Sequence, residues 1–162
     1  MKLSARILKW VMRFYPPLFF QRIWVKSIAA DFTSIEVKVH KSIFNINYNK
    51  TIFGGTIFSA VDPFYVLLFH QVMLRRGIKT IAWLKSASVQ YLKPGHGDLY
   101  LKICISQDEI NEAMYTLETE GKFIKSYPIQ ITDVDGHVCA ELSNEIYMRD
   151  IYFSFQSSPN NS

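Results

Sequence analysis

The sequence predicts an α+β domain in which a curled antiparallel sheet wraps around one long buried helix, with an extra helix at the N-terminus. Residues 51–74 are apolar on every side of a helical wheel, which is typical of a helix at the centre of a domain. The segments around it alternate apolar and polar residues as strands do, and short turns join most of them, as antiparallel sheets allow. The chain has 162 residues, 49% of them hydrophobic, which is enough for one core but too little for two ordinary domains.

Five segments are predicted to be strands, four by the alternation of apolar residues and residues 80–92 by their richness in β-forming residues, and a short helix lies among them. The strand segments are residues 34–39, 80–92, 99–105, 123–131 and 138–148. Turn residues at 93–98 and 133–136 separate several of them. A capping box at Ser106–Glu109 opens an acidic helix that ends near Leu117. The predicted order is therefore a strand, the long helix and four further strands.

The N-terminal segment carries the positive charge of the chain. Residues 1–26 contain no acid, and their basic residues are Lys2, Arg6, Lys9, Arg13, Arg22 and Lys26. The net charge of the whole chain is only +4, so the folded body is close to neutral. Nucleic-acid binding needs a basic face on the folded part, and we therefore expect no nucleic-acid partner.

Residues 1–26 are predicted to be a basic amphipathic helical segment that precedes the main domain. Residues 3–14 form its first helix, whose apolar stripe consists of Leu3, Ile7, Trp10, Val11 and Phe14. Residues 18–24 form a second helical turn or two. Lys9 and Arg13 interrupt the apolar stretch, which argues against a signal peptide. The segment suits packing on its own domain or a neighbouring subunit, and it equally suits peripheral membrane contact.

The long apolar helix is predicted to lie in the protein core and not in a membrane. Its length would allow a span, but Asp62, Pro63, His70 and Gln71 lie within it, and a lone carboxylate at mid-bilayer is costly. If the helix begins near Thr56, Pro63 lies beyond its first turn and kinks the axis. His70 is expected to be a core histidine. The main domain then covers residues 27–152, and residues 153–162 have the composition of a disordered tail.

The two cysteines indicate a reducing compartment. Cys104 and Cys139 lie far apart and match neither a disulfide framework nor a metal-ligand spacing. We expect two buried thiols in a cytoplasmic protein, with no structural metal.

Asp62 is the residue that most needs an explanation. It is the only acid between Glu36 and Asp98, and it lies in the most apolar stretch of the chain. A buried carboxylate is normally hydrogen-bonded, paired or functional, and burial raises its pKa. The alternative is that it bonds amides freed by Pro63 or faces an opening. Upstream, Gly54 and Gly55 begin the helix, where unsatisfied amides suit a carbonyl oxygen that gains negative charge. Together these features predict an acyl-transfer site.

The same residues resemble a known family. Phe53-Gly54-Gly55, followed by Phe58 and Asp62, is similar to the His-Gly-Gly…Asp signature of hotdog-fold acyl-CoA thioesterases of the phenylacetate-pathway type. Asn47 falls where that group has an Asn. A fuller pattern consists of Thr51, residues 53–55, residues 62–65 and residues 91–95. This pattern resembles the branch of the superfamily described as a domain of unknown function or as tetrameric acyl-CoA thioesterase-like. The similarity spans residues 34–149.

The resemblance implies a homodimer, or a dimer of dimers, with active sites at the subunit interface. An amide matching Gly54 or Gly55 polarises the thioester carbonyl, and the acid matching Asp62 comes from the opposite subunit as general base or nucleophile. Asn47 positions water or the acyl carbonyl. Coenzyme A enters as part of the substrate, so no separate cofactor or metal is expected.

Three further residues are expected to contact substrate, and two positions depart from the family. Phe53, Thr56 and Lys85 are the expected contacts; Lys85 would pair with Asp62 or a coenzyme A phosphate, or else extend to solvent. Phe53 replaces the family histidine, and Leu84 falls where some members have a Ser or Thr that assists water. The sequence therefore leaves two hypotheses: an acyl-CoA thioesterase, and a non-catalytic acyl- or lipid-binding hotdog protein that contacts a membrane.

Overall fold

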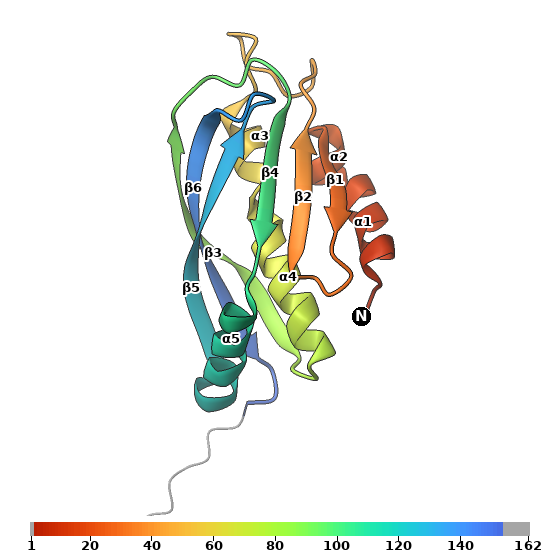
Figure 1. Ribbon diagram of the computed structural model, residues 1–162, viewed down its shortest axis with the longest axis vertical. Helices are drawn as coiled ribbons and strands as arrows, with labels where there is room; N and C mark the ends of the chain where they lie inside the picture. Colours follow the sequence, from red (N-terminus) through yellow and green to blue (C-terminus); the bar gives the residue numbers. More distant parts are fainter. Residues whose placement is uncertain (1, 154–162) are drawn as a thin grey trace, which may run out of the picture.

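The computed structural model describes residues 2–153 and shows one sheet curled around a central helix (Figure 1). Of the tail predicted at 153–162, only Phe153 lies within the described residues. The sheet order is β1-β2-β4-β5-β6-β3, and every neighbouring pair is antiparallel. The strands are β1 (Ile23–Ile28), β2 (Ser34–Val39), β3 (Thr80–Tyr91), β4 (Leu99–Cys104), β5 (Lys122–Thr132) and β6 (Val138–Asp150). This is the predicted α+β architecture.

The alternation of residues in the strands is the reason that one face of the sheet is buried. In β2, Ile35, Val37 and Val39 are buried, and the residues between them are partly exposed. In β6 the inward positions run from Ala140 to Met148 at every second residue. The inner face of β5 receives the helix, since the ring of Phe69 lies 5.3 Å from that of Tyr127.

The long apolar segment forms two helices and not one kinked helix. α3 (Gly54–Ser59) and α4 (Asp62–Arg75) are separated at Ala60 and Val61. The prediction that Pro63 lies beyond the first turn is wrong, because Pro63 lies in the first turn of α4. Residues of the first turn make no N–H bond within the helix, so the missing N–H of proline costs nothing there. By length and composition alone Gly54–Arg75 would suffice to cross a membrane, but most of it is buried inside the protein.

A side chain from the sheet anchors this break. The amide of Asn144, on β6, donates to the carbonyl of Val61 at 3.2 Å, and Asn144 is fully buried. Its side-chain oxygen has no hydrogen-bond partner among residues 2–153. Asn144 is thus a buried polar side chain with an oxygen that is unpaired within the described part of the chain. Its bond to Val61 holds the residue that immediately precedes α4.

The N-terminal segment contains a strand that the sequence analysis did not predict. α1 (Ala5–Phe14) and α2 (Pro16–Phe20) are followed by β1, which begins at Ile23, so the second helical turn predicted over 18–24 ends earlier. β1 pairs with β2 and crosses the predicted boundary at residue 26. Four residues of β1 are apolar, and two of them, Ile23 and Val25, are buried, so this short strand adds to the core.

The apolar stripe predicted for the first helix does not face the core. Leu8 and Met12 are its buried residues, whereas Ile7, Trp10, Val11 and Phe14 are exposed. Of the predicted stripe, Leu3 alone packs partly against the core. The helix has two apolar faces, and only one of them is covered by the domain.

The remaining elements follow the sequence closely. α5 (Gln107–Glu120) begins at the predicted capping box, in which Ser106 and Glu109 bond each other's backbone amides. It ends at Gly121, whose φ of 74° favours glycine. Of the two cysteines expected to be buried, Cys139 is buried and Cys104 is exposed.

Replacing Asn144 tests the anchor at the helix break. We expect Asn144→Ala to lower the free energy of unfolding by about 1–3 kcal/mol, because the Val61 carbonyl loses a buried donor. Urea denaturation followed by circular dichroism measures the change. Ser143→Ala, on the outward side of the same strand, should change stability little. Equal stabilities of the two variants would show that the bond does not hold the break.

Candidate functional site

A groove runs between α4 and the first half of the edge strand β3, and it contains Asp62. Its volume is about 570 Å³. Its lining residues come from α1, α4 and β3: Met12, Asp62, Pro63, Val66, Leu67, His70 and residues 80–84. The walls are mostly apolar, with one carboxyl and one imidazole group. We call it the α4–β3 groove.

Asp62 is the first residue of α4, and the helix break directs it into this groove. Among residues 2–153 its carboxylate has no hydrogen-bond or ion-pair partner. Burial removes water from the carboxylate and raises its pKa above the ordinary value of 3.8. A carboxylate that is partly desolvated and free of partners can accept a proton from water, so the group suits general-base chemistry.

His70 is a groove residue that the sequence analysis assigned to the core. It lies eight residues after Asp62, about two turns along α4 and about 80° around its axis, and both residues line the groove. Its Nδ1 lies 3.0 Å from the hydroxyl oxygen of Thr80, and it is only partly buried. Burial is the main reason that its pKa lies below 6.5, so the imidazole is neutral at pH 7. The signal in the sequence was the helical spacing of Asp62, Val66 and His70.

A second hollow lies at the other end of β3 and contains Gly54. Its volume is about 360 Å³, and its lining residues are Asn47, Thr51, Ile52, Gly54, Ile57 and residues 91–95. The hydroxyl of Tyr91 donates to the Gly54 carbonyl at 3.0 Å. This bond ties the last residue of β3 to the first residue of α3. We call it the β3-end hollow.

The amides of Gly54 and Gly55 are available to an acceptor. Within residues 2–153 neither N–H group donates to a carbonyl or a side chain, because both belong to the first turn of α3. A Cβ on Gly55 would collide with the ring of Phe53, which therefore lies against this glycine. Phe53, at the position of the family histidine, supplies an apolar surface here.

Asn47 and Thr56 are held by their own surroundings. The side-chain oxygen of Asn47 accepts from the amides of Asn49 and Thr51 at 3.0 and 3.2 Å, and its nitrogen donates to the Thr51 hydroxyl at 2.9 Å. Asn47 thus closes its own loop at the β3-end hollow. Thr56 is buried in α3 and lines neither the α4–β3 groove nor the β3-end hollow.

Lys85 does not pair with Asp62. Its Nζ lies 2.8 Å from the carboxylate of Glu145 on the neighbouring strand β6. The register of β3 against β6 shifts between Leu84 and Ser86, and Lys85 lies at this irregularity. Lys85 therefore belongs to an ion pair outside the groove, whereas Leu84 lines the groove.

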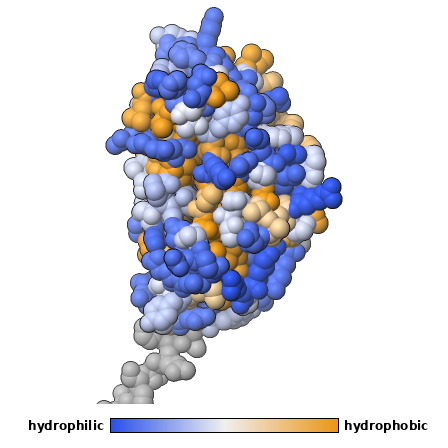
Figure 2. Space-filling view, viewed as in Figure 1, coloured by the Kyte–Doolittle hydropathy of each residue, from blue (hydrophilic) through white to orange (hydrophobic). Residues whose placement is uncertain are grey.

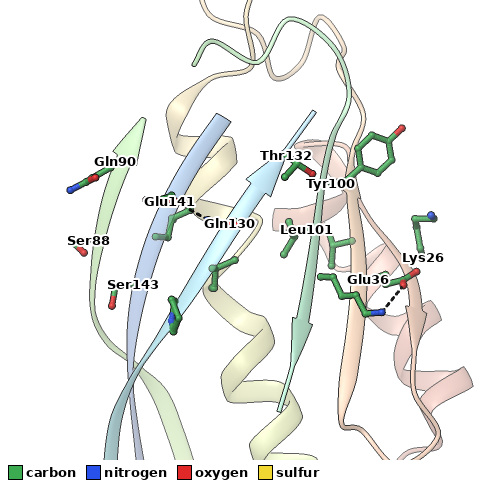
Figure 3. A pocket seen from close by; sticks show the side chains of 15 residues that line it. Lys26, Glu36, Ser88, Gln90, Tyr100, Leu101, Gln130, Thr132, Glu141 and Ser143 are labelled. Carbon is green, nitrogen blue, oxygen red and sulfur yellow. Dashed lines mark hydrogen bonds and ion pairs between the residues drawn. The ribbon is translucent and has the colours of Figure 1, made fainter. Parts of the chain in front are cut away.

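A third and larger hollow lies elsewhere, on the outer face of the sheet between β4 and β5. These strands share one pair, Tyr100 with Thr132, and then diverge. The opening has a volume of about 900 Å³, and apolar residues form a band along its floor (Figure 2). Two pairs of polar side chains lie on its rim: Lys102 pairs with Glu36 at 3.5 Å, and Gln130 donates to Glu141 at 2.8 Å (Figure 3). None of the predicted site residues lines this hollow.

One cluster of potential metal ligands occurs in the hairpin between β5 and β6. Asp133, Asp135 and His137 place ligand atoms within 4.8 Å of one another, which the sequence analysis did not foresee. The Asp133 carboxylate accepts from the backbone amides of Asp135 and His137 at 3.0 and 2.9 Å. These bonds close the turn, which accounts for the cluster without an ion.

The raised pKa of Asp62 predicts a pH-dependent effect on stability. Folding favours the protonated carboxyl, so ionised Asp62 opposes folding at pH 7. We expect Asp62→Asn to raise the melting temperature at pH 7, and the gain to vanish as the pH falls below 3.8, where both folded and unfolded states are protonated. Differential scanning calorimetry across this range measures it, with the exposed Asp135→Asn as control. A variant less stable than the parent at pH 7 would contradict the prediction.

Comparison with known proteins identifies the fold. A structure of a protein of unknown function from Pseudomonas aeruginosa has a TM-score of 0.77 and 16% identity over 92% of this chain and 97% of that chain. A thioesterase from Haemophilus influenzae has a TM-score of 0.67 and 9% identity over 96% of each chain. The Escherichia coli PaaI protein of the phenylacetic acid degradation operon has a TM-score of 0.60 and 14% identity over 89% of this chain and 95% of that chain.

These likenesses confirm the predicted hotdog fold, which the chain shares with proteins that bear thioesterase names. A search of curated proteins gave no match. A family model described as Domain of unknown function (DUF4442) matches residues 4–148. Because this match covers most of the sequence, the chain belongs to the DUF4442 family.

Proposed function

We propose that this protein hydrolyses acyl thioesters such as acyl-CoA at composite sites in a homodimer. The observation that carries the proposal is the Asp62 carboxylate, partly buried in an apolar groove and unpaired among the described residues. The hotdog neighbours that bear thioesterase names support the reaction class.

The edge strand β3 supplies the geometry of the dimer. It offers 12 residues with a free side, and antiparallel pairing with a second copy would extend the sheet. In such a pair the first half of one β3 lies opposite the last half of the other. The α4–β3 groove of one subunit then meets the β3-end hollow of its partner. Asp62 of one chain and the Gly54 and Gly55 amides of the other would share a site.

The proposed reaction uses these groups in one order. The Asp62 carboxylate takes a proton from a water molecule as its oxygen attacks the thioester carbonyl. The carbonyl oxygen, now negative, accepts hydrogen bonds from the Gly54 and Gly55 amides. The carbon–sulfur bond then breaks, and the proton on Asp62 passes to the departing sulfur. The products are a carboxylic acid and a free thiol.

The groove walls favour an apolar acyl group. Val66 and Leu67 on α4 and the inward-facing Ala82 and Leu84 on β3 line the groove beside Asp62. Phe53 adds an apolar surface beside Gly55. In this proposal Asn47 holds the conformation of its own loop at the β3-end hollow. Lys85 would contact a coenzyme A phosphate only if its ion pair with Glu145 broke.

A non-catalytic acyl-binding role is the second candidate, and Leu84 favours it. Leu84 lines the groove next to Asp62 and offers no hydroxyl group to a water molecule. Binding of an acyl-CoA without turnover by the unmodified protein would support this role against hydrolysis.

Replacing Asp62 tests the reaction. We expect Asp62→Asn to lower kcat for an apolar acyl-CoA by at least about 100-fold with little change in KM, because the general base is lost. Activity of the parent protein should fall at acid pH as Asp62 is protonated, with a midpoint above 3.8. Release of free thiol, followed with a chromogenic disulfide, measures both. Asp135→Asn should match the parent, and parental activity in the Asp62→Asn variant would reject the mechanism.

The dimer is tested at Ala87, near the middle of β3. Close to the axis of an antiparallel pair, a residue faces its own copy, so Ala87→Asp and Ala87→Lys should each dissociate the dimer through repulsion of like charges. Mixing the two variants should restore dimer and activity together. Light scattering and the thiol assay measure these outcomes. Unchanged dimers in both variants would rule out pairing through β3.

A further inference from the structure

The face formed by α1 and α2 exposes four aromatic rings in mutual contact. Ring centroids lie 6.0 Å apart for Trp10 and Phe14, 6.1 Å for Phe14 and Phe19, and 5.6 Å for Phe19 and Phe20. Their exposed fractions are 46%, 60%, 37% and 68% in chain order. We call this row the aromatic ladder. It joins two helices into one continuous apolar surface.

The ladder is not the face that packs on the domain. α1 buries Leu8 and Met12 on its other side, and Met12 lines the α4–β3 groove. Ile7 and Val11 are also exposed and extend the ladder along α1. An apolar surface of this extent marks an interaction site, and it lies on the outer side of the helices beside β1 (Figure 1).

Basic residues flank the ladder, and acids are missing from this part of the sequence. Lys2, Arg6 and Lys9 precede or lie on α1, and the first acid of the chain is Asp31. At about 100° per residue, Arg6 and Lys9 lie on a sector next to the exposed apolar stripe of α1. Arg13 instead ties α1 to the edge strand β1, because its Nε donates to the Val25 carbonyl at 2.8 Å.

We propose that the aromatic ladder docks on an anionic phospholipid bilayer. Aromatic rings prefer the boundary between headgroups and acyl chains, and neighbouring Lys and Arg side chains attract anionic headgroups. A second copy of the chain is a poorer occupant, because two such faces would bring their basic flanks together. The charge of the face therefore complements a negative membrane and opposes self-association through the same face.

Vesicle sedimentation of the full chain tests the proposal. The probes are vesicles of phosphatidylcholine alone and of equal parts phosphatidylcholine and phosphatidylglycerol. We expect binding to the anionic vesicles only, weakened by salt. Phe14→Ser combined with Phe20→Ser should reduce binding by at least about tenfold, because two exposed rings no longer enter the interface. Tyr115→Ser, an exposed aromatic residue on α5, should leave binding unchanged (Figure 1).

Charge and oligomeric state separate the alternative occupants. Lys2→Gln, Arg6→Gln and Lys9→Gln together should remove the preference for anionic vesicles while circular dichroism shows the same fold. Equal binding by the parent and the Phe14→Ser/Phe20→Ser variant would overturn the proposal. A parent that ignores vesicles but loses a higher oligomer in that variant would assign the face to a second copy instead. Neither result depends on thioester hydrolysis, because the experiments measure vesicle binding, fold and oligomeric state and do not measure enzymatic activity.

Discussion

A helix that is apolar on every side has to be covered on every side, and this constraint organises the molecule. The sheet curls around α4 and covers it from β2 to β3, and α1 adds Met12 from another element. The core is dense in aromatic residues where α4 meets β5, with Tyr65 stacked on Tyr127 at 4.6 Å. Coverage stops at the groove beside β3, so the one acid of the helix lies where the wrapping is incomplete.

The break between α3 and α4 places Asp62 at the start of α4, where it lines the α4–β3 groove. A continuous helix would carry Asp62 in its middle, whereas the break makes Asp62 the first residue of α4. Pro63 is compatible with the break because a first-turn residue needs no intrahelical acceptor. Asn144 holds the Val61 carbonyl from the sheet. A buried hydrogen bond is electrostatically stronger than one in water, and this one lies next to the carboxylate that the proposed reaction uses.

The two edges of the sheet face different environments. β1 is closed by α1, with Arg13 bonded to the backbone of β1. β3 keeps a free side next to the groove, and a long open edge strand is a template for pairing with another chain. The proposed dimer therefore uses the β3 edge, whereas the proposed membrane face is the exposed side of the helices beside β1.

The sequence by itself determined the elements whose signal is local. Alternation of apolar residues located β2, β4, β5 and β6, and β-forming composition located β3. The capping box located α5, and the spacing of Gly54, Gly55 and Asp62 indicated the family resemblance. Tertiary structure decided what depends on partners distant in sequence. β1 is a short strand that is stabilised by pairing with β2. Lys85 forms its ion pair with Glu145 because β6 lies beside β3 in the sheet. The exposed side of α1 was likewise decided by packing, since a helix with two apolar faces does not specify which one the domain covers.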